Sequence, residues 1–551
     1  MPDQFEFNSR RSAVYGQRGM VAASQPLAVA AGLEVLALGG NAADAAVATA
    51  AALGVTEPAS TGLGGDCFAL FYEARTGRVS ALNGSGRAPA ALTLERLRRE
   101  GFEQELPPYH PYTITVPGAC AGWCDLVERH GRLSMSAILA PAIRLAEAGF
   151  PVAPLTAHEW DYGVKNQLLT APGGLEMTIE GRSPRPGEIF RNPNLAKTLQ
   201  RVAEGGKGAF YQGALAHSIA SAVQSVGGCL SDADLADHTS TWEEPLNITY
   251  RDLRVWECPP NGQGLAALLA LNILEGFDLA ELAPLSAKRL HLEIEALRLA
   301  FADARQYVAD PAFNQLPLQE LLSKEYAAGR RKLILHDQAT LDQVHGSPDS
   351  SSNTVYLSVV DGEGNACSFI NSIYDDFGTG IVPPGCGFCL QNRALNFSLD
   401  PHHPNALAPG KRPYHTIIPA LATRLPGIDS PSPGAAETLY ACFGVMGGFM
   451  QPQGHLQVMV ALQDDDLDPQ SALDRPRFCI LGGDQGGSVA LEEGIPVKVM
   501  SDLADLGHPL FPVSGNGRSM FGRGQVILRD WATGVLAGGS DPRADGCVMT
   551  Y

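Results

Sequence analysis

The sequence predicts an α+β protein, in which helix-forming and strand-forming segments occupy different parts of the chain. Alanine-rich stretches alternate with glycine-rich turns in the first region, and apolar residues recur at helical spacing through much of 126–335. From Thr354 onward, short runs of β-branched and aromatic residues separated by turns indicate strands. With 551 residues, the chain can form two to four ordinary domains or one large unit.

The first two helices have clear boundary signals. Ser24-Gln-Pro-Leu should begin a helix that runs to about Leu38, and Gly39-Gly40 should end it. Asn41 then has the character of an N-cap, with Asp44 in the first turn of a second helix.

A glycine-rich turn, Thr61-Gly-Leu-Gly-Gly-Asp66, should lead into a strand over 67–72. It lacks the lysine of a phosphate-binding loop and does not open a helix, so the sequence favours a simple turn. Pro284–Val308 is a clear later helix, and the polar stretch 338–353 is typical of an exposed linker.

Composition and charge exclude several classes of function. Hydrophobic residues make up 45% of the chain and charged residues 18%, as in a globular enzyme. A net charge of -19 argues against nucleic acid and gives no attraction to anionic lipid. The apolar stretch 42–54 is too short and too polar for a membrane span, so we expect no membrane partner.

The N-terminal residues show no signal peptide, which predicts a cytoplasmic protein with reduced thiols. Cys386-Gly-Phe-Cys389 has the spacing of half a zinc site, but no companion pair accompanies it. The favoured interpretation is two small buried residues. We expect no metal and no cofactor.

Asn353-Thr354 is the dipeptide that points most clearly to a catalytic function. Thr354 begins the run 354–361, and the turn Gly362-Glu-Gly-Asn365 separates it from a second run, 366–373. If the turn centres on Glu363, Ser372 lies directly across from Thr354, within about 5 Å between Cβ atoms. Were the preceding peptide bond cut, Thr354 would carry a nucleophilic hydroxyl and a basic α-amine on one residue. An ordinary Thr–Ser cross-strand pair is the alternative.

Several motifs, taken in order, resemble those of one family over nearly the full length of the chain. They are 19–26, 39–46, 54–58, 62–65, 115–118, 354–361, 377–381, 474–478 and 540–543. On these segments the sequence resembles the γ-glutamyltranspeptidase family of N-terminal-nucleophile hydrolases. The resemblance implies a four-layer αββα sandwich and synthesis as a precursor.

The resemblance also implies how the precursor would mature and act. Self-cleavage between Asn353 and Thr354 would give a large subunit, 1–353, and a small subunit, 354–551, that stay associated in one αββα unit. A dimer of these heterodimers is left open. Ser372 matches the second hydroxyl of the family, and Gly447-Gly448 matches the glycines whose N–H groups form the oxyanion hole.

The chain departs from the family where γ-glutamyl groups are recognised. Ser85 stands where the family has an arginine that binds the α-carboxylate, and Arg87 lies two residues later. The family's α-amine-binding positions match Tyr374, Arg393 and Asn396, without an acidic partner.

The family's paired serines match His415 and Thr416. Each of these residues has a structural alternative: Arg87 could fix a turn, Arg393 could pair with an acid, and His415 could be a satisfied buried imidazole. Asp375-Asp376 is expected to be a solvated turn.

An arginine-rich pocket suits a carboxylate without a neighbouring amine. The sequence therefore predicts an autoprocessing threonine amidohydrolase that cleaves an amide of a small carboxylic acid. Within the family, the oxamate amidohydrolase branch fits this prediction best. Two rivals stay open: γ-glutamyl hydrolysis or transfer, as in a glutathione hydrolase, and a scaffold or binding protein that never matures.

Overall fold

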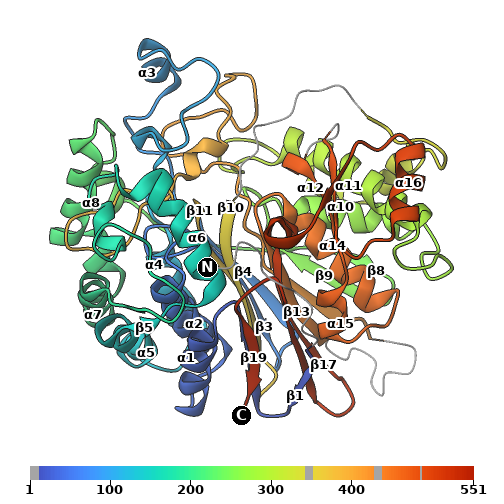
Figure 1. The fold of residues 1–551 in the computed structure, drawn as a ribbon, viewed down its shortest axis with the longest axis horizontal. Coiled ribbons are helices and arrows are strands. Elements are labelled where there is room, and N and C mark those ends of the chain that lie inside the picture. The colour runs from blue at the N-terminus through green and yellow to red at the C-terminus, as the bar shows by residue number, and fades with distance from the viewer. Residues whose placement is uncertain (1–10, 342–351, 427–436, 484–486) are drawn as a thin grey trace.

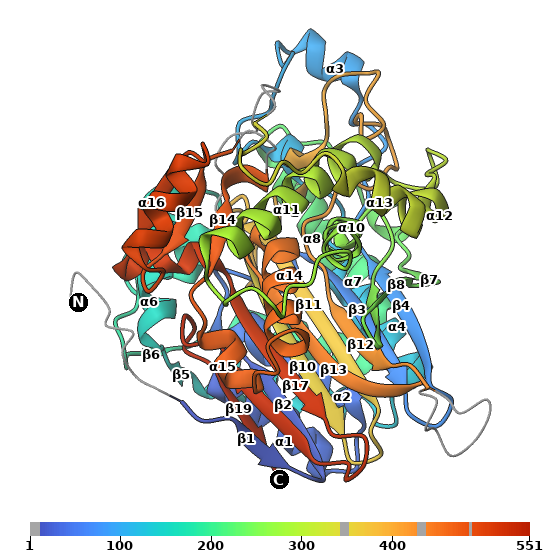
Figure 2. The same ribbon diagram turned by 90° about the vertical axis from the view of Figure 1, so that its right-hand side faces the viewer.

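Two seven-stranded sheets stack face to face in this computed structural model, and helices cover the outer face of each sheet (Figures 1 and 2). The structure describes residues 11–341, 352–426, 437–483 and 487–551. The layer order is helix, sheet, sheet, helix, which confirms the four-layer αββα sandwich.

The first sheet has the strand order β19-β2-β10-β11-β3-β4-β7, and every neighbouring pair is antiparallel. In chain order its strands are β2 (Gly19–Ala23), β3 (Asp66–Glu73), β4 (Arg78–Gly84), β7 (Thr241–Glu243), β10 (Ser352–Asp361), β11 (Ala366–Asp375) and β19 (Cys547–Thr550).

The second sheet has the order β1-β18-β17-β13-β12-β9-β8. Its strands are β1 (Val14–Gly16), β8 (Leu246–Tyr250), β9 (Leu253–Glu257), β12 (Ala420–Arg424), β13 (Thr438–Met446), β17 (Arg523–Arg529) and β18 (Leu536–Ser540). Both sheets therefore contain strands from either side of the Asn353-Thr354 junction.

Each helical layer has its own core, and a third core lies between the sheets. Against the first sheet pack α1 (Pro26–Ala37), α2 (Ala42–Thr56) and α4 (Ala119–His130), and these helices are covered by α5 (Met135–Ala148), α7 (Pro193–Tyr211) and α8 (Gly213–Ser225). Against the second pack α10 (Gly264–Leu274), α14 (Met450–Gln463) and α15 (Pro469–Asp474), with α11 (Ala287–Tyr307) and α16 (Val497–Asp505) further out. A small side sheet joins β14 (Phe478–Ile480), β15 (Val489–Glu492) and β16 (Leu510–Val513).

The hairpin of β10 and β11 has the register that the sequence predicts. Val355 pairs with Asn371, and the same register continues to Val360 opposite Ala366. An irregularity between Asn353 and Val355 interrupts the ladder at Thr354. The strand begins at Ser352 rather than at Thr354, so the junction lies inside β10. Most of the predicted linker, 342–351, lies outside the described residues.

The predicted helix boundaries at α1 and α2 are confirmed. The Asn41 side chain accepts from the N–H groups of Ala43 and Asp44, and the Asp44 carboxylate accepts from the Asn41 N–H. This reciprocal capping box satisfies N–H groups that the helix itself cannot pair. The Asn41 Nδ2 also donates to the His130 carbonyl at 2.5 Å, which ties the cap to the end of α4.

Replacement of Asn41 by alanine should lower the free energy of unfolding by about 1–3 kcal/mol, because a cap and a buried hydrogen bond disappear together. Chemical denaturation measures the change. Thr93→Ala, which removes the cap of the short helix α3 (Leu94–Arg99), is the matched control with the smaller expected loss. An Asn41→Ala protein no less stable than the Thr93→Ala protein would contradict this assignment.

One part of the expected secondary structure is wrong. Three strands, β7, β8 and β9, lie within 241–257, where the sequence favours helices. β8 and β9 are the edge of the second sheet, where neighbouring strands and α10 complete their packing. Within the described residues, no helix has the length and apolar character required to cross a membrane.

Candidate active site

Thr354 and Ser372 meet at the end of the β10–β11 hairpin. Thr354 Oγ1 donates to Ser372 Oγ at 3.2 Å, and both side chains are fully buried in this uncut chain. Ser372 Oγ also accepts from the Tyr374 N–H at 2.9 Å. Since Tyr356 and Ile370 lie on the same strand face and pack between the sheets, the two hydroxyls belong to the inter-sheet side of the hairpin.

Arg393 is the cation of this cluster. Its Nη2 donates to Ser372 Oγ at 2.9 Å and its Nη1 to Thr416 Oγ1 at 2.8 Å. The guanidinium carbon lies 4.4 Å from the centre of the Tyr374 ring. Burial lowers the pKa of Arg393 to about 10, so the group stays protonated at neutral pH. A positive charge one hydrogen bond from Ser372 favours loss of a proton from the hydroxyl pair.

Arg393 has an unusual environment for a buried cation. Among the described residues, no carboxylate forms an ion pair with its guanidinium and its Nε has no hydrogen-bond partner, although the charges of Asp66 and Asp375 act on it from a greater distance. Buried charges are ordinarily paired, so this one has unused capacity for an anion. The alternative of a simple structural ion pair does not fit this geometry.

The glycines assigned to the oxyanion hole lie at the start of α14. Gly447 and Gly448 have φ values of 129° and 57°, which glycine adopts without the strain of a side chain. Their carbonyl oxygens accept from the N–H groups of Met450 and Gln451, while neither glycine N–H has an acceptor within the described part of the chain. The helix N-terminus therefore presents two donors that could bind a developing oxyanion.

Gln263 links this turn to the Arg393 cluster. Its Nε2 donates to the carbonyl oxygens of Thr416 at 2.6 Å and Gly448 at 2.9 Å. A continuous set of hydrogen bonds thus joins Gly448, Gln263, Thr416, Arg393 and Ser372.

His415 is hydrogen-bonded through both ring nitrogens. Its Nε2 bonds to Asp66 Oδ2 at 3.0 Å, and its Nδ1 accepts from the Ile417 N–H at 3.3 Å. Burial, together with nearby Arg393, lowers its pKa to about 4, so the ring is neutral. Both nitrogens are satisfied, which matches the alternative of a buried structural imidazole and corrects the assignment of His415 to direct substrate binding.

Asp66 is a buried carboxylate that accepts hydrogen bonds from several segments around His415. Its Oδ1 accepts from the N–H groups of Gly86 and Gly118 and from Gln391 Nε2, at 2.9–3.0 Å. Desolvation by burial raises the pKa of this carboxyl, but its interactions with His415, Arg393 and Gln391 outweigh that effect and hold the pKa below its ordinary value. Asp66 also pairs with Ser372 across the β3–β11 ladder, so it lies directly beside the second hydroxyl-bearing residue.

Arg87 and Asn396, two of the predicted binding residues, differ in whether their side chains already have a hydrogen-bond partner. Arg87 is half-buried and its Nη1 donates to the Thr239 carbonyl at 3.0 Å, in the manner of the turn-fixing alternative. Asn396 lies three residues after Arg393 in the same helical turn, and its buried Nδ2 has no partner among the described residues. Asn396 therefore has an unused buried donor in the turn that carries Arg393, whereas Arg87 has a structural partner.

The solvated turn expected at Asp375-Asp376 is wrong in its exposure: a turn does begin at Asp376, but Asp376 is buried. Asp375 ends β11, where its Oδ2 accepts from Asn392 Nδ2 at 2.8 Å. Its Oδ1 is buried without a hydrogen-bond partner in the described chain. Burial raises the pKa of Asp375 to about 6, and the charge of Arg393 moderates that rise.

Sequence reasoning missed Asp66, Gln263, Gln391 and Asp375 as parts of the site. The glycine-rich turn before Asp66 could have indicated that this segment belongs to the site. A Cβ on Gly64 would come within 1.9 Å of the Cys389 carbonyl oxygen, and one on Gly65 within 2.1 Å of the Ser372 carbonyl oxygen. These glycines permit close backbone packing at the hairpin end.

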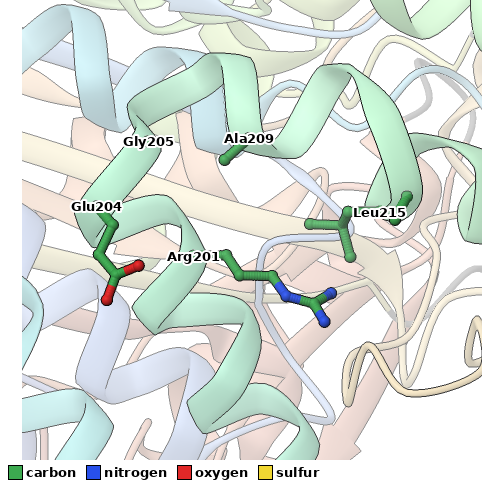
Figure 3. Close-up of a pocket in the computed structure, with 6 residues that line it drawn as sticks. Arg201, Glu204, Gly205, Ala209 and Leu215 are labelled. Carbon is green, nitrogen blue, oxygen red and sulfur yellow. The ribbon is translucent and has the colours of Figure 1, made fainter.

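Other candidate features lie elsewhere. A surface pocket of about 380 Å³ lies between α7 and α8, lined by Arg201, Glu204 and Leu215 among others, and shares no residue with the Thr354 cluster (Figure 3). Cys386 and Cys389 are buried free thiols, in line with the packing interpretation.

Comparisons with known proteins agree with this geometry. The family model described as Gamma-glutamyltranspeptidase matches residues 28–551. The glutathione hydrolase-like YwrD proenzyme of Bacillus subtilis is 36% identical, with 97% of this chain and 99% of the relative covered. The oxamate amidohydrolase proenzyme of Klebsiella pneumoniae is 34% identical, with 97% and 98% covered.

A solved structure is similar over the whole chain. The cephalosporin acylase from Bacillus halodurans has a TM-score of 0.90 and 46% identity, with 100% of this chain and 99% of that chain covered. Two of the three relatives are named as proenzymes, which agrees with maturation by cleavage. The chain thus belongs to the γ-glutamyltranspeptidase family and is an amidohydrolase of the autoprocessing N-terminal-nucleophile type.

Proposed function

We propose that the mature protein hydrolyses amides whose acyl group carries a carboxylate and lacks an α-amine, with oxamate as the smallest such substrate. Maturation begins when Thr354 Oγ adds to the carbonyl carbon of Asn353. The C–N bond breaks, an ester forms, and the nitrogen becomes the α-amine of Thr354. Water then hydrolyses the ester, which leaves a carboxylate on Asn353.

Catalysis repeats this chemistry on the substrate. The α-amine takes the proton from Thr354 Oγ, and the oxygen adds to the substrate carbonyl. The N–H groups of Gly447 and Gly448 stabilise the oxyanion. The leaving nitrogen takes the proton from the ammonium group, and water releases the acid from the acyl ester.

The observation that carries the substrate class is the state of Arg393. Its guanidinium is buried beside Ser372 and donates to hydroxyls, with no carboxylate of the described chain in ion-pair contact. A substrate carboxylate would supply a direct ion-pair partner, closer than Asp66 and Asp375, and could form the two parallel bonds that guanidinium groups favour. The buried Nδ2 of Asn396 is a further donor for the same group.

Asp375 favours a second candidate, γ-glutamyl hydrolysis. Its buried, unpartnered Oδ1 is the kind of acceptor that an α-ammonium group requires. Relatives named for glutathione and for oxamate are about equally similar to this chain, so they do not separate the candidates.

A matched pair of anilides tests the proposal, because glutaryl anilide is γ-glutamyl anilide without its α-amine. We expect the processed protein to prefer the glutaryl compound by at least about tenfold in kcat/KM, which corresponds to about 1.4 kcal/mol. Ammonia release from oxamate tests the shortest acyl group. A preference for γ-glutamyl anilide, or transfer to a dipeptide in place of hydrolysis, would refute it.

Asp375→Asn should change the pH dependence of KM. Asp375 ionises as pH rises through about 6, and the new negative charge near Arg393 opposes binding of a substrate carboxylate. In the unmodified protein, KM for glutaryl anilide should rise roughly three- to tenfold between pH 5 and pH 7, since nearby charges interact by about 1 kcal/mol or more. The variant should show a low, flat KM.

Steady-state kinetics at several pH values measure this effect, and Asp400→Asn on an exposed residue is the control. If the variant instead loses affinity for γ-glutamyl anilide and gains none for the glutaryl compound, Asp375 holds an ammonium group and the second candidate is correct.

A further inference from the structure

We propose that His291, Glu295 and His508 form a binding site for a divalent transition-metal ion such as Zn²⁺, separate from the Thr354 cluster. His291 and Glu295 lie one turn apart on α11, and His508 lies between α16 and β16. All three side chains are buried, and one potential ligand atom from each lies within 4.8 Å of the others.

The histidines already direct specific nitrogens toward one point. His291 Nδ1 lies 2.8 Å from His508 Nε2. His291 Nε2 donates to the Leu335 carbonyl at 2.6 Å, so His291 Nδ1 is an acceptor and His508 Nε2 carries the proton of the bond between the rings. Metal binding would move that proton to His508 Nδ1, a buried nitrogen with no hydrogen-bond partner in the described chain. A metal-binding histidine ordinarily donates its other N–H to such a carbonyl.

Glu295 supplies an oxygen with unused capacity. Its Oε2 accepts from the Thr340 N–H at 3.0 Å, while its buried Oε1 has no hydrogen-bond partner in the described chain. Among the described residues this oxygen is paired with Arg298, whose Nε lies 3.6 Å away and beyond hydrogen-bond distance, so a bound cation would be a closer partner. The carboxylate is thus oriented by one oxygen and available through the other.

Two imidazoles and one carboxylate are a ligand set that Zn²⁺ accepts, with water as a fourth ligand. Metal–nitrogen bonds of about 2.0–2.1 Å require the two histidine nitrogens to separate by a few tenths of an ångström. Arg298 Nε lies 3.6 Å from Glu295 Oε1, and its positive charge opposes a dication. We therefore expect a dissociation constant on the order of 1 μM, weaker than that of a structural zinc site.

The site has a consequence for the processed protein, and this part of the inference depends on cleavage at Asn353-Thr354. His291 and Glu295 belong to the predicted large subunit and His508 to the small subunit. Leu335 and Thr340, which bond to the two large-subunit ligands, lie close before the junction. Bound metal would link the end of the large subunit to the small one.

Calorimetric titration of chelator-treated, tag-free processed protein with Zn²⁺ tests the site. We expect one ion per chain, and Co²⁺ in place of Zn²⁺ should give the visible absorption bands of a nitrogen- and oxygen-bound ion. His508→Ala and Glu295→Gln should each weaken binding more than about a hundredfold, since the loss of a ligand exceeds the effect of an outer partner.

Glu295→Gln keeps an oxygen for the Thr340 N–H and protects the test against misfolding. His217→Ala, on an exposed histidine near Asp232, is the control that should bind normally. Zn²⁺ should raise the Tm of the unmodified and His217→Ala proteins only. No binding by the unmodified protein, or equal binding by His508→Ala and Glu295→Gln, would overturn the proposal, whatever the amidase activity.

Discussion

Thr354→Ala should leave the chain uncut and lower amide hydrolysis by at least about 10⁴-fold. The substitution removes the oxygen that attacks Asn353 and the oxygen that would later carry the acyl group. Without cleavage the nitrogen of residue 354 stays in a peptide bond and cannot act as a base. A denaturing gel reports the cut, and an anilide assay reports turnover.

Thr354→Ser keeps the hydroxyl and should still mature, although more slowly or less completely. N-terminal sequencing of its smaller fragment should then begin at residue 354. Thr49→Ala removes a buried hydroxyl on α2 whose one hydrogen bond within the described residues goes to the Ala45 carbonyl, so it is the matched control and should be cut normally. A cut Thr354→Ala protein would exclude the assigned nucleophile, and an uncut unmodified protein would favour a scaffold that never matures.

Arg393→Met should raise KM for glutaryl anilide by about 10²-fold or more, because the variant loses the cation that pairs with the substrate carboxylate. Methionine fills a similar volume without charge. The KM of Arg393→Lys should lie between those of the unmodified protein and Arg393→Met. One ammonium group cannot bond to Ser372 and Thr416 with the geometry of a guanidinium.

A neutral substrate separates recognition from structural support. Butyryl anilide lacks the carboxylate, so its kcat/KM should change far less in Arg393→Met than that of glutaryl anilide. If both substrates lose activity equally, Arg393 acts through Ser372 and the proposed carboxylate pocket is wrong. Denaturation of each variant checks that folding is intact, since removal of a buried charge need not destabilise the protein.

Local signals in the sequence predicted much of the fold. Asn41 and Gly39-Gly40 mark the boundary of α1 and α2 because capping and chain reversal are decided by neighbouring residues. The same locality explains the hairpin: a short turn at 362–365 sets the register from Val355 to Val360. Strands β7–β9 were not predicted, because their stability depends on pairing and packing with distant segments.

The chemical character of the pocket was harder to predict from the sequence than the fold. Arg393 could be placed from the family resemblance, but its burial and its lack of a carboxylate partner are properties of the surroundings. His415 looked equally suited to substrate, yet Asp66, from 349 residues away, occupies its Nε2. Asp375 looked solvent-exposed, although packing around Asn392 buries it and raises its pKa.

The sequence by itself determined that Thr354, the proposed nucleophile, meets the hydroxyl of Ser372, because both belong to one hairpin whose register follows from its turn. Only the tertiary structure decided what surrounds them. Arg393, Thr416, Gly448 and Asp66 come from four separate segments. Their hydrogen bonds, exposure and pKa values depend on how the two sheets and their connecting loops pack, and no local pattern encodes that arrangement.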